Sequence, residues 1–211
     1  METFLVLGLL GSTFAMVFSK RISALIGNFA LQSFFLCLFS FMEALKGNHL
    51  GLYLISGLIL VLKVILIPQI IRYVAVNIKS DENLGFFISP QLSLVCALVL
   101  TYLAWLLAST VFMGQPILIR IFGATAFSMV SLGIFLMIFR IIALAQVIGL
   151  LAMENGIFLL ASAVSGGMPF IVEMAIFFDI FVGVVILGIF IFRINKLFVG
   201  IDVSKLNSLK G

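Results

Sequence analysis

Long apolar runs, separated by short polar or basic breaks, dominate the hydrophobicity pattern of this chain. A helix that crosses a lipid bilayer needs about 20 mostly apolar residues. The pattern predicts seven such spans, at residues 3–18, 22–42, 50–71, 92–113, 119–139, 141–164 and 169–192. Only Arg140 separates the fifth span from the sixth, whereas residues 77–90 form the longest polar connection. We therefore expect an all-α, polytopic integral membrane protein.

The composition supports a membrane location. Of the 211 residues 64% are hydrophobic and 9% are charged, whereas soluble domains have about 45–50% apolar and about 25% charged residues. The first apolar run does not resemble a cleaved signal peptide, because the acidic Glu2 stands where a signal peptide is basic. The basic residues Lys20 and Arg21 follow that run instead. We expect the first run to be a span of the protein.

The sequence lacks the residue patterns that several classes of activity require. Cys37, Cys96 and His49 stand alone, without the spacing of metal ligands, and there is no glycine-rich phosphate loop. We therefore expect no catalytic residue, cofactor or metal in this chain. The net charge of +4 is better explained by membrane topology than by nucleic-acid binding.

Basic residues predict the orientation, because Lys and Arg concentrate on the cytoplasmic side of membrane proteins. With seven spans and the N-terminus outside, only Lys46 and Arg120 fall outside. The residues that fall inside are Lys20, Arg21, Arg72, Lys79, Arg140, Arg193, Lys196, Lys205 and Lys210. The sequence thus predicts a multi-pass protein of the cell's inner (cytoplasmic) membrane with a cytoplasmic C-terminus.

Three charged residues, Lys63, Glu154 and Asp179, lie near the centres of their predicted spans. Each costs roughly 2.5–3.5 kcal/mol to insert, so such residues face a bundle interior, a hydrated cavity or a partner. Acids and a lysine at one depth can exchange protons along the membrane. Glu173, about one turn inside the seventh span, and Gln146, two turns before Glu154, complete the predicted proton or ion path.

Structural interpretations compete with this hypothesis. Lys63 can form a buried ion pair with Asp179 or Glu154 without moving any proton. Asn155 is more typical of an interhelical hydrogen-bond donor than of a site residue. Pro68 breaks the backbone hydrogen bonding of the third span, as a hinge or as a passive kink.

The chain contains a weak internal similarity. The stretch "ALIGNFALQSFF" (24–35) aligns with "QVIGLLAMENGI" (146–157), so that Gln32 corresponds to Glu154. The first three and last three spans would then be parallel repeats joined by the fourth. The expected parts are an N-terminal three-helix half (1–80), a linker with the fourth helix (81–115) and a C-terminal three-helix half (116–211).

Four stretches resemble one known family. These are "LLAMENG" (150–156), "VEMAIFFDIFVGVVI" (172–186), the tail "IDVSKLNSLKG" (201–211) and "KVILIPQIIRYVAVNI" (63–78). Together they resemble component E of hydrogenase-4, a membrane subunit of formate-hydrogenlyase-type, energy-converting hydrogenase complexes. The resemblance runs over most of the chain.

The last three spans also resemble subunit K of respiratory complex I and the small C subunit of Mrp-type cation/proton antiporters. Those subunits have acids at the centres of their second and third helices. When Gly149 is aligned, Leu151 stands in place of the second-helix glutamate, and the carboxylate follows one turn later as Glu154. Asp179 corresponds to the third-helix glutamate. The first half of the chain has no counterpart in subunit K.

The resemblance implies a non-catalytic membrane subunit of a group 4 hydrogenase or complex I-like oxidoreductase. It would pack between a channel subunit and antiporter-like subunits, and its acids would move protons or sodium ions as electrons are transferred. The alternatives are a structural subunit that spaces its neighbours and a stand-alone small-solute transporter. The transporter is disfavoured because the sequence lacks discontinuous helices with polar, glycine-rich centres.

Overall fold

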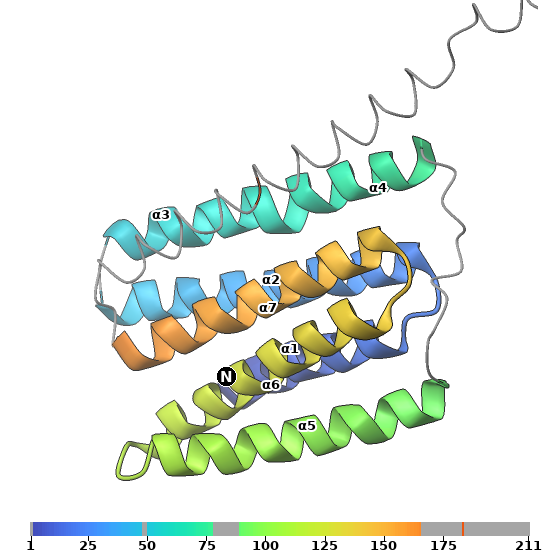
Figure 1. Cartoon of the computed structure of the whole chain (residues 1–211). Helices are drawn as coiled ribbons and strands as arrows, with labels where there is room; N and C mark the ends of the chain where they lie inside the picture. The colour runs from blue at the N-terminus through green and yellow to red at the C-terminus, as the bar shows by residue number, and fades with distance from the viewer. Residues whose placement is uncertain (1, 48–49, 78–88, 166–182, 184–211) are drawn as a thin grey trace, which may run out of the picture. The chain divides into compact units, whose positions relative to one another are not determined.

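Helices make up every regular element that the computed structural model describes, over residues 2–47, 50–77, 89–165 and 183 (Figure 1). The elements are α1 (Glu2–Phe18), α2 (Ile22–Gly47), α3 (Leu50–Ile59), the π-helix η1 (Leu60–Leu66), α4 (Ile67–Asn77), α5 (Pro90–Val111), α6 (Ile117–Phe139) and α7 (Ala143–Ser165). The first six predicted spans are therefore helical. The seventh, at 169–192, lies outside the described residues except for Gly183.

Length and composition fit a multi-pass membrane protein. Five of the described helical segments are long and apolar enough to cross a bilayer, and they are 22–46, 53–76, 91–111, 117–139 and 143–164. The third of these combines α3, η1 and α4. Helix α1 is also apolar but shorter, with 17 residues, so it would cross only a locally thinner bilayer.

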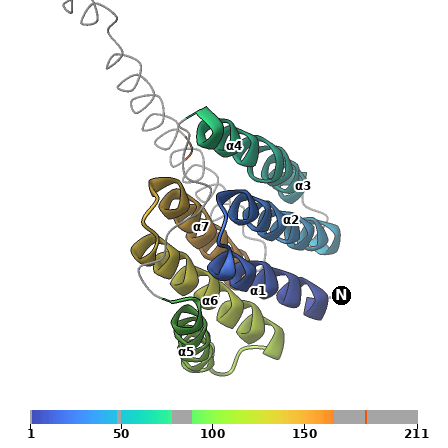
Figure 2. The same cartoon turned by 90° about the vertical axis from the view of Figure 1, so that its right-hand side faces the viewer.

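The chain divides into two units, residues 1–176 and 177–211, and the first contains all the helices above. Within this unit α1 packs against α2, α5 and α6, while α2 also packs against α3, η1, α4 and α7. Helix α5 lies against α6 (Figure 2). Helices of the expected N-terminal half thus pack directly on helices of the C-terminal half. The parallel repeat stays a prediction.

Helices α6 and α7 approach each other closely because glycines face the contact. A Cβ on Gly133 would lie 2.7 Å from the backbone nitrogen of Met153, and one on Gly149 would lie 2.9 Å from the carbonyl oxygen of Gly133. A Cβ on Gly156 would lie 2.9 Å from the nitrogen of Val130. Small residues allow such backbone contact between membrane helices, where dispersion replaces the hydrophobic effect as the source of attraction.

The middle of the third span is a π-helix rather than an α-helix. Proline has no N–H to donate, and its ring clashes with the carbonyl four residues back. Pro68 is the second residue after η1, and the N–H of Ile67 donates to the carbonyl of Leu62. The wider π turn accommodates the proline without ending the helix. π segments are rare and frequent at functional sites, and Lys63 lies at the centre of this one.

The predicted turn at 114–116 is present between α5 and α6. Gly114 has a φ of 84°, a left-handed conformation that glycine adopts without a steric penalty. Helix α5 begins two residues before the predicted boundary, because Ser89 caps it by accepting a hydrogen bond from the N–H of Leu92 and Pro90 occupies its first turn.

Candidate functional site: a buried polar chain between four helices

Polar side chains from four helices meet inside the first unit. Thr13 comes from α1, Gln32 and Ser33 from α2, Lys63 from η1, and Asn155 from α7. All are buried, and Lys63 exposes only 3% of its surface. Lys63, Gln32 and Asn155 lie near the middle of their membrane-spanning segments. Two of the three central charges predicted from the sequence, Lys63 and Glu154, therefore belong to the described interior.

Hydrogen bonds join these side chains into one chain. Lys63 Nζ donates to Asn155 Oδ1 over 2.9 Å, and Asn155 Nδ2 donates to Gln32 Oε1 over 3.1 Å. Gln32 Nε2 donates to Thr13 Oγ1 over 2.8 Å, and Thr13 donates to the carbonyl of Leu9 over 2.6 Å. Unsatisfied polar groups are costly in a dry interior, and this chain supplies each of these donors with an acceptor.

Asn155 is the branch point of the chain. Its Nδ2 also donates to Ser33 Oγ over 3.1 Å, so one amide connects α7 to two residues of α2 and accepts from η1. The interhelical role expected for Asn155 is confirmed. Its contact with Lys63 also places it in the candidate site, which the sequence analysis had disfavoured.

Glu154 is buried on α7 next to Asn155 and exposes 2% of its surface. Glu154 thus lies within one residue of the lysine's hydrogen-bond partner, and charged side chains inside membrane spans are candidate site residues. The site thus combines an acid, a base and amide dipoles in a low-dielectric interior, where electrostatic interactions are strong.

Of the other residues of the predicted path, the structure describes only Gln146. Gln146 is an exposed residue in the first turns of α7, and its Nε2 donates to the backbone carbonyl of Arg140 over 2.9 Å. It lies two turns from Glu154 along the same helix. Asp179 and Glu173 lie outside the described residues.

Arg140 forms a second buried polar site, at the junction between α6 and α7. Its guanidinium Nη2 donates to the carbonyls of Val17 and Met16, over 2.7 and 3.3 Å. These carbonyls belong to the last turn of α1, where backbone acceptors lack intrahelical partners and a cation complements the helix dipole. Burial lowers the pKa of Arg140 to about 10, so the side chain stays cationic at neutral pH.

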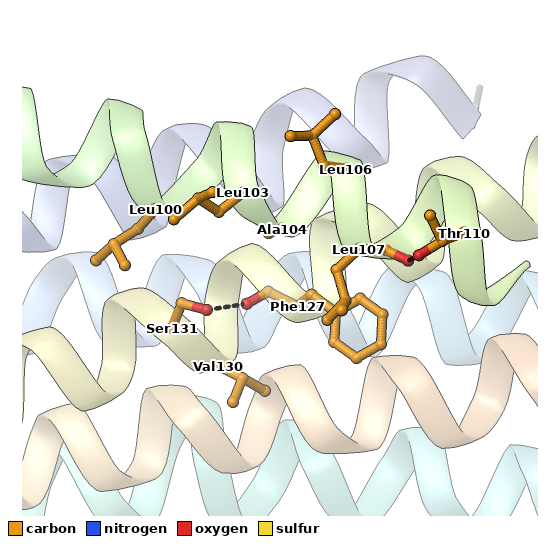
Figure 3. A pocket seen from close by; sticks show the side chains of 9 residues that line it. All are labelled: Leu100, Leu103, Ala104, Leu106, Leu107, Thr110, Phe127, Val130 and Ser131. Atoms are coloured by element: carbon orange, nitrogen blue, oxygen red, sulfur yellow. Dashed lines mark hydrogen bonds between the residues drawn. The ribbon is translucent and has the colours of Figure 1, made fainter.

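An apolar groove lies between α5 and α6 (Figure 3). It encloses about 670 Å³, and leucines of α5 and Phe127 of α6 line it. Its two hydroxyls, of Thr110 and Ser131, donate to carbonyls of their own helices, Leu107 and Phe127. The groove therefore presents hydrocarbon and no spare polar group, which suits contact with lipid or an apolar helix.

Within the described ranges, no three His, Cys, Asp or Glu side chains gather as a metal site would require. Sequence reasoning missed Thr13 and Ser33 as members of the polar chain and noticed Gln32 only through the internal similarity. The available signal was a glutamine in the middle of an apolar span, which is as costly to leave unpaired as the asparagine that it contacts.

A similar protein exists in Mycobacterium tuberculosis. It is an uncharacterized protein, 24% identical over 204 residues, which are 96% of this chain and 93% of the relative. The similarity thus extends along nearly the whole of both proteins. No family model and no solved structure matches the chain.

Proposed function

We propose that this chain is a membrane subunit of an energy-converting, complex I-like oxidoreductase of the group 4 hydrogenase or formate-hydrogenlyase type. In this role its central charged residues contribute to proton or sodium ion translocation coupled to electron transfer. The observation that carries the proposal is the position of Lys63, which donates to Asn155 at mid-span beside the buried Glu154.

The free-energy cost of burying two charged residues supports ion movement. Burying a lysine and a glutamate at mid-depth is unfavourable by several kcal/mol, and an apolar pair of similar size would pack there without that cost. A π-helix at Lys63 and a proline two residues past its end add local departures from regular helix geometry. These features at one place support a functional use of the two charges, with Asp179 as a further acid on the proposed path.

The proposed partners are the channel and antiporter-like membrane subunits of such an assembly. Large apolar side chains of α5, among them Tyr102, Trp105 and Leu107, are at least half exposed within the first unit. In a membrane this surface contacts lipid or neighbouring subunits. Extraction in mild detergent should bring antiporter-like subunits down with this chain, and a monodisperse monomer from native membranes would contradict the assignment.

The proposed orientation has the N-terminus outside and the C-terminus in the cytoplasm. Gln115 and Ile141 are exposed residues at opposite ends of α6. In a background without Cys37 and Cys96, a cysteine at position 115 should react with an impermeant reagent from outside, and one at position 141 only from inside. The reverse pattern would invert the topology.

The decisive test of the function is redox-driven ion uptake in vesicles, normalised to the amount of assembled complex. Glu154→Gln keeps the size and hydrogen bonding but removes titration, so the complex should assemble and lose coupled ion movement. Asp179→Asn should act in the same way, and Lys63→Met should alter coupling if the lysine shares the path. Glu43→Gln, on the surface of α2, is the matched control and should leave uptake unchanged.

A structural subunit that only spaces its neighbours is the second candidate. The interhelical hydrogen bonds of Asn155 favour it, because they would hold α2 and α7 together whether or not a proton moves. This candidate predicts wild-type coupling in both the Glu154→Gln and Asp179→Asn variants. That outcome would remove the support for ion translocation by this chain.

A further inference from the structure

The polar chain from Lys63 to α1 has a fixed direction. Its last acceptor is the backbone carbonyl of Leu9, which has no proton to donate. The single hydroxyl proton of Thr13 is used on that carbonyl, over 2.6 Å. Thr13 Oγ1 can therefore only accept from Gln32, so the Gln32 amide must present its nitrogen to α1 and its oxygen to α7.

The same reasoning orients Asn155. Because Gln32 Oε1 faces α7, Asn155 must donate to it with Nδ2, over 3.1 Å. The Asn155 oxygen then faces η1, where it accepts from Lys63 Nζ over 2.9 Å. Oxygen and nitrogen of an amide are usually assigned from the surrounding hydrogen-bond network. Here the acceptor-only carbonyl at one end determines both amides.

We infer that Thr13 and Gln32 are positioning residues for Lys63, acting through Asn155 along a one-way hydrogen-bond chain. The chain keeps an acceptor oxygen aimed at the lysine nitrogen and thereby holds that nitrogen at one place in the interior. Thr13, on a different helix, controls the lysine across three successive hydrogen bonds. This inference deepens the proposed function, on which its consequence for ion movement rests.

A matched pair of threonines makes the inference testable. Thr13 and Thr125 are both buried, and each donates to the carbonyl four residues earlier, over 2.6 and 2.9 Å. Thr13 in addition accepts from Gln32. Thr13→Val and Thr125→Val therefore remove the same local bond, and only the first also leaves the Gln32 nitrogen without its acceptor.

Cys37 provides the stability measurement in native membranes. It is buried in α2, and its Sγ donates to the carbonyl of Ser56 over 3.3 Å. In a Cys96→Ser background, the temperature at which a membrane-permeant maleimide modifies half of Cys37 reports the opening of this part of the fold. Thr13→Val should lower that midpoint by about 2–4 °C more than Thr125→Val does, and Thr13→Ser should restore it.

A double-mutant cycle between Thr13→Val and Lys63→Met completes the test. Without the lysine there is no Nζ for the chain to hold in place, so the part of the Thr13→Val cost that comes from losing that position should disappear. Additive effects of Thr13→Val and Lys63→Met would overturn the one-way chain. If Lys63→Met does not accumulate, Gln32→Met serves instead, because it cuts the chain at its centre. An extra cost of Thr13→Val that persists in that background would equally refute the inference.

Ion uptake separates this inference from the proposed function. Per assembled complex, Thr13→Val should reduce redox-driven uptake several-fold, Thr13→Ser should restore it, and Thr125→Val should leave it unchanged. Full uptake in Thr13→Val despite a positive cycle would contradict the positioning role. Full uptake in Lys63→Met would instead contradict the part of the proposed function that uses the lysine, and the stability cycle would still decide whether the chain exists.

Discussion

Helix α7 contacts its neighbours in two opposite ways. Toward α6 it presents Gly149 and Gly156, and the two backbones come into van der Waals contact. Toward α2 and η1 it presents Asn155, whose amide makes hydrogen bonds to both. We call these contacts the glycine seam and the polar seam. One helix therefore contributes to a tight apolar contact on one side and to a hydrogen-bonded interior on the other.

The difference between the seams shows what each can do. The glycine seam contains groups that neither titrate nor change partners, and its strength comes from the sum of many weak dispersion contacts. The polar seam depends on a few directional bonds between groups that are costly to leave unpaired. For the ion translocation proposed above, the polar seam would supply the groups that exchange partners, and the glycine seam would keep α6 and α7 in register.

The largest effect is expected when the glycine seam is overpacked. Gly133→Ala places a Cβ 2.7 Å from the backbone nitrogen of Met153. Backbone atoms cannot rotate away, so the free energy of unfolding should fall by about 3 kcal/mol, the upper end of the range for overpacking. The measurement is the thermal midpoint of the purified chain with its accompanying subunits in mild detergent.

Gly57→Ala is the control for this substitution. Gly57 is also helical, and a Cβ there meets nothing within 4 Å. The higher helix propensity of alanine should leave stability unchanged or raise it by up to about 1 kcal/mol. Equal destabilisation by both variants would show that the close approach of α6 and α7 does not determine the cost.

The next largest effect is expected in the polar seam. Asn155→Leu removes one hydrogen bond of Lys63 and the donor to Gln32. A buried polar group that loses a hydrogen-bond partner costs about 1–3 kcal/mol, partly recovered by relaxation. We expect a net loss of about 2 kcal/mol. Unlike the clash at Gly133, this loss can be compensated by a second change. Gln32→Leu combined with Asn155→Leu should cost less than the sum of the two single variants, and strict additivity would argue against a connected chain.

A smaller effect is expected at Arg140, whose hydrogen bonds connect the end of α1 to the junction of α6 and α7. Arg140→Met removes the bonds to the carbonyls of Met16 and Val17, and it also removes a buried charge. Hydrogen bonds to charged groups contribute about 1.5–3 kcal/mol, and the relief of desolvation offsets part of this. We expect a loss of about 1.5 kcal/mol, against a change within about 0.5 kcal/mol for Arg72→Met on the exposed side of α4.

The pH dependence sharpens this prediction. Burial lowers the pKa of Arg140 from its ordinary value to about 10. The unfolded chain therefore binds more protons than the folded chain only from about pH 10 up to the ordinary pKa of arginine, and stability from this group rises with pH in that window. Below it both states are charged, so the difference between wild type and Arg140→Met should be constant from neutral pH to about 9. A difference that changes between pH 6 and about 8 would place another titrating group at this site.

The sequence predicted the apolar helices of the described residues well, because an apolar run of membrane length has few other uses. It predicted the helix ends less well. Helix α2 continues to Gly47 and the third span to Asn77, beyond the predicted 42 and 71, since a helix need not end where its hydrophobicity does. Lys63 and Glu154 were predicted as interior residues because charge in an apolar run is conspicuous.

The partners of these residues could not be predicted in the same way. Asn155 meets Gln32 across 123 positions of sequence, and no local pattern encodes that pairing. In a soluble helix a polar face would have indicated which side is buried. Both sides of α7 are apolar, because lipid and protein interior favour the same residues. The role of Arg140 was missed for a related reason, since its acceptors are backbone carbonyls, which every sequence supplies.

The smallest change in stability is expected from Pro68→Ala. This variant changes the orientation of Lys63 without substituting any residue of the polar seam. Alanine restores a backbone N–H and removes the ring that the π turn accommodates. The third span can then become a regular α-helix, which gains helix propensity. Removing the π turn shifts the helical register by one residue, which rotates Lys63 by about 100° relative to α4. The gained propensity and the lost bond to Asn155 oppose each other, so the net change in unfolding free energy should be below about 1 kcal/mol.

The informative measurement is therefore the cost of Asn155→Leu in the two backgrounds. With Pro68 present, Asn155→Leu breaks the hydrogen bonds to both Lys63 and Gln32, whereas with Pro68→Ala the bond to the lysine is already lost. The cost should then fall by about half, while Pro116→Ala, at the N-cap of α6, should leave it unchanged. An undiminished cost in the Pro68→Ala background would mean that the π-helix does not aim Lys63 at the chain.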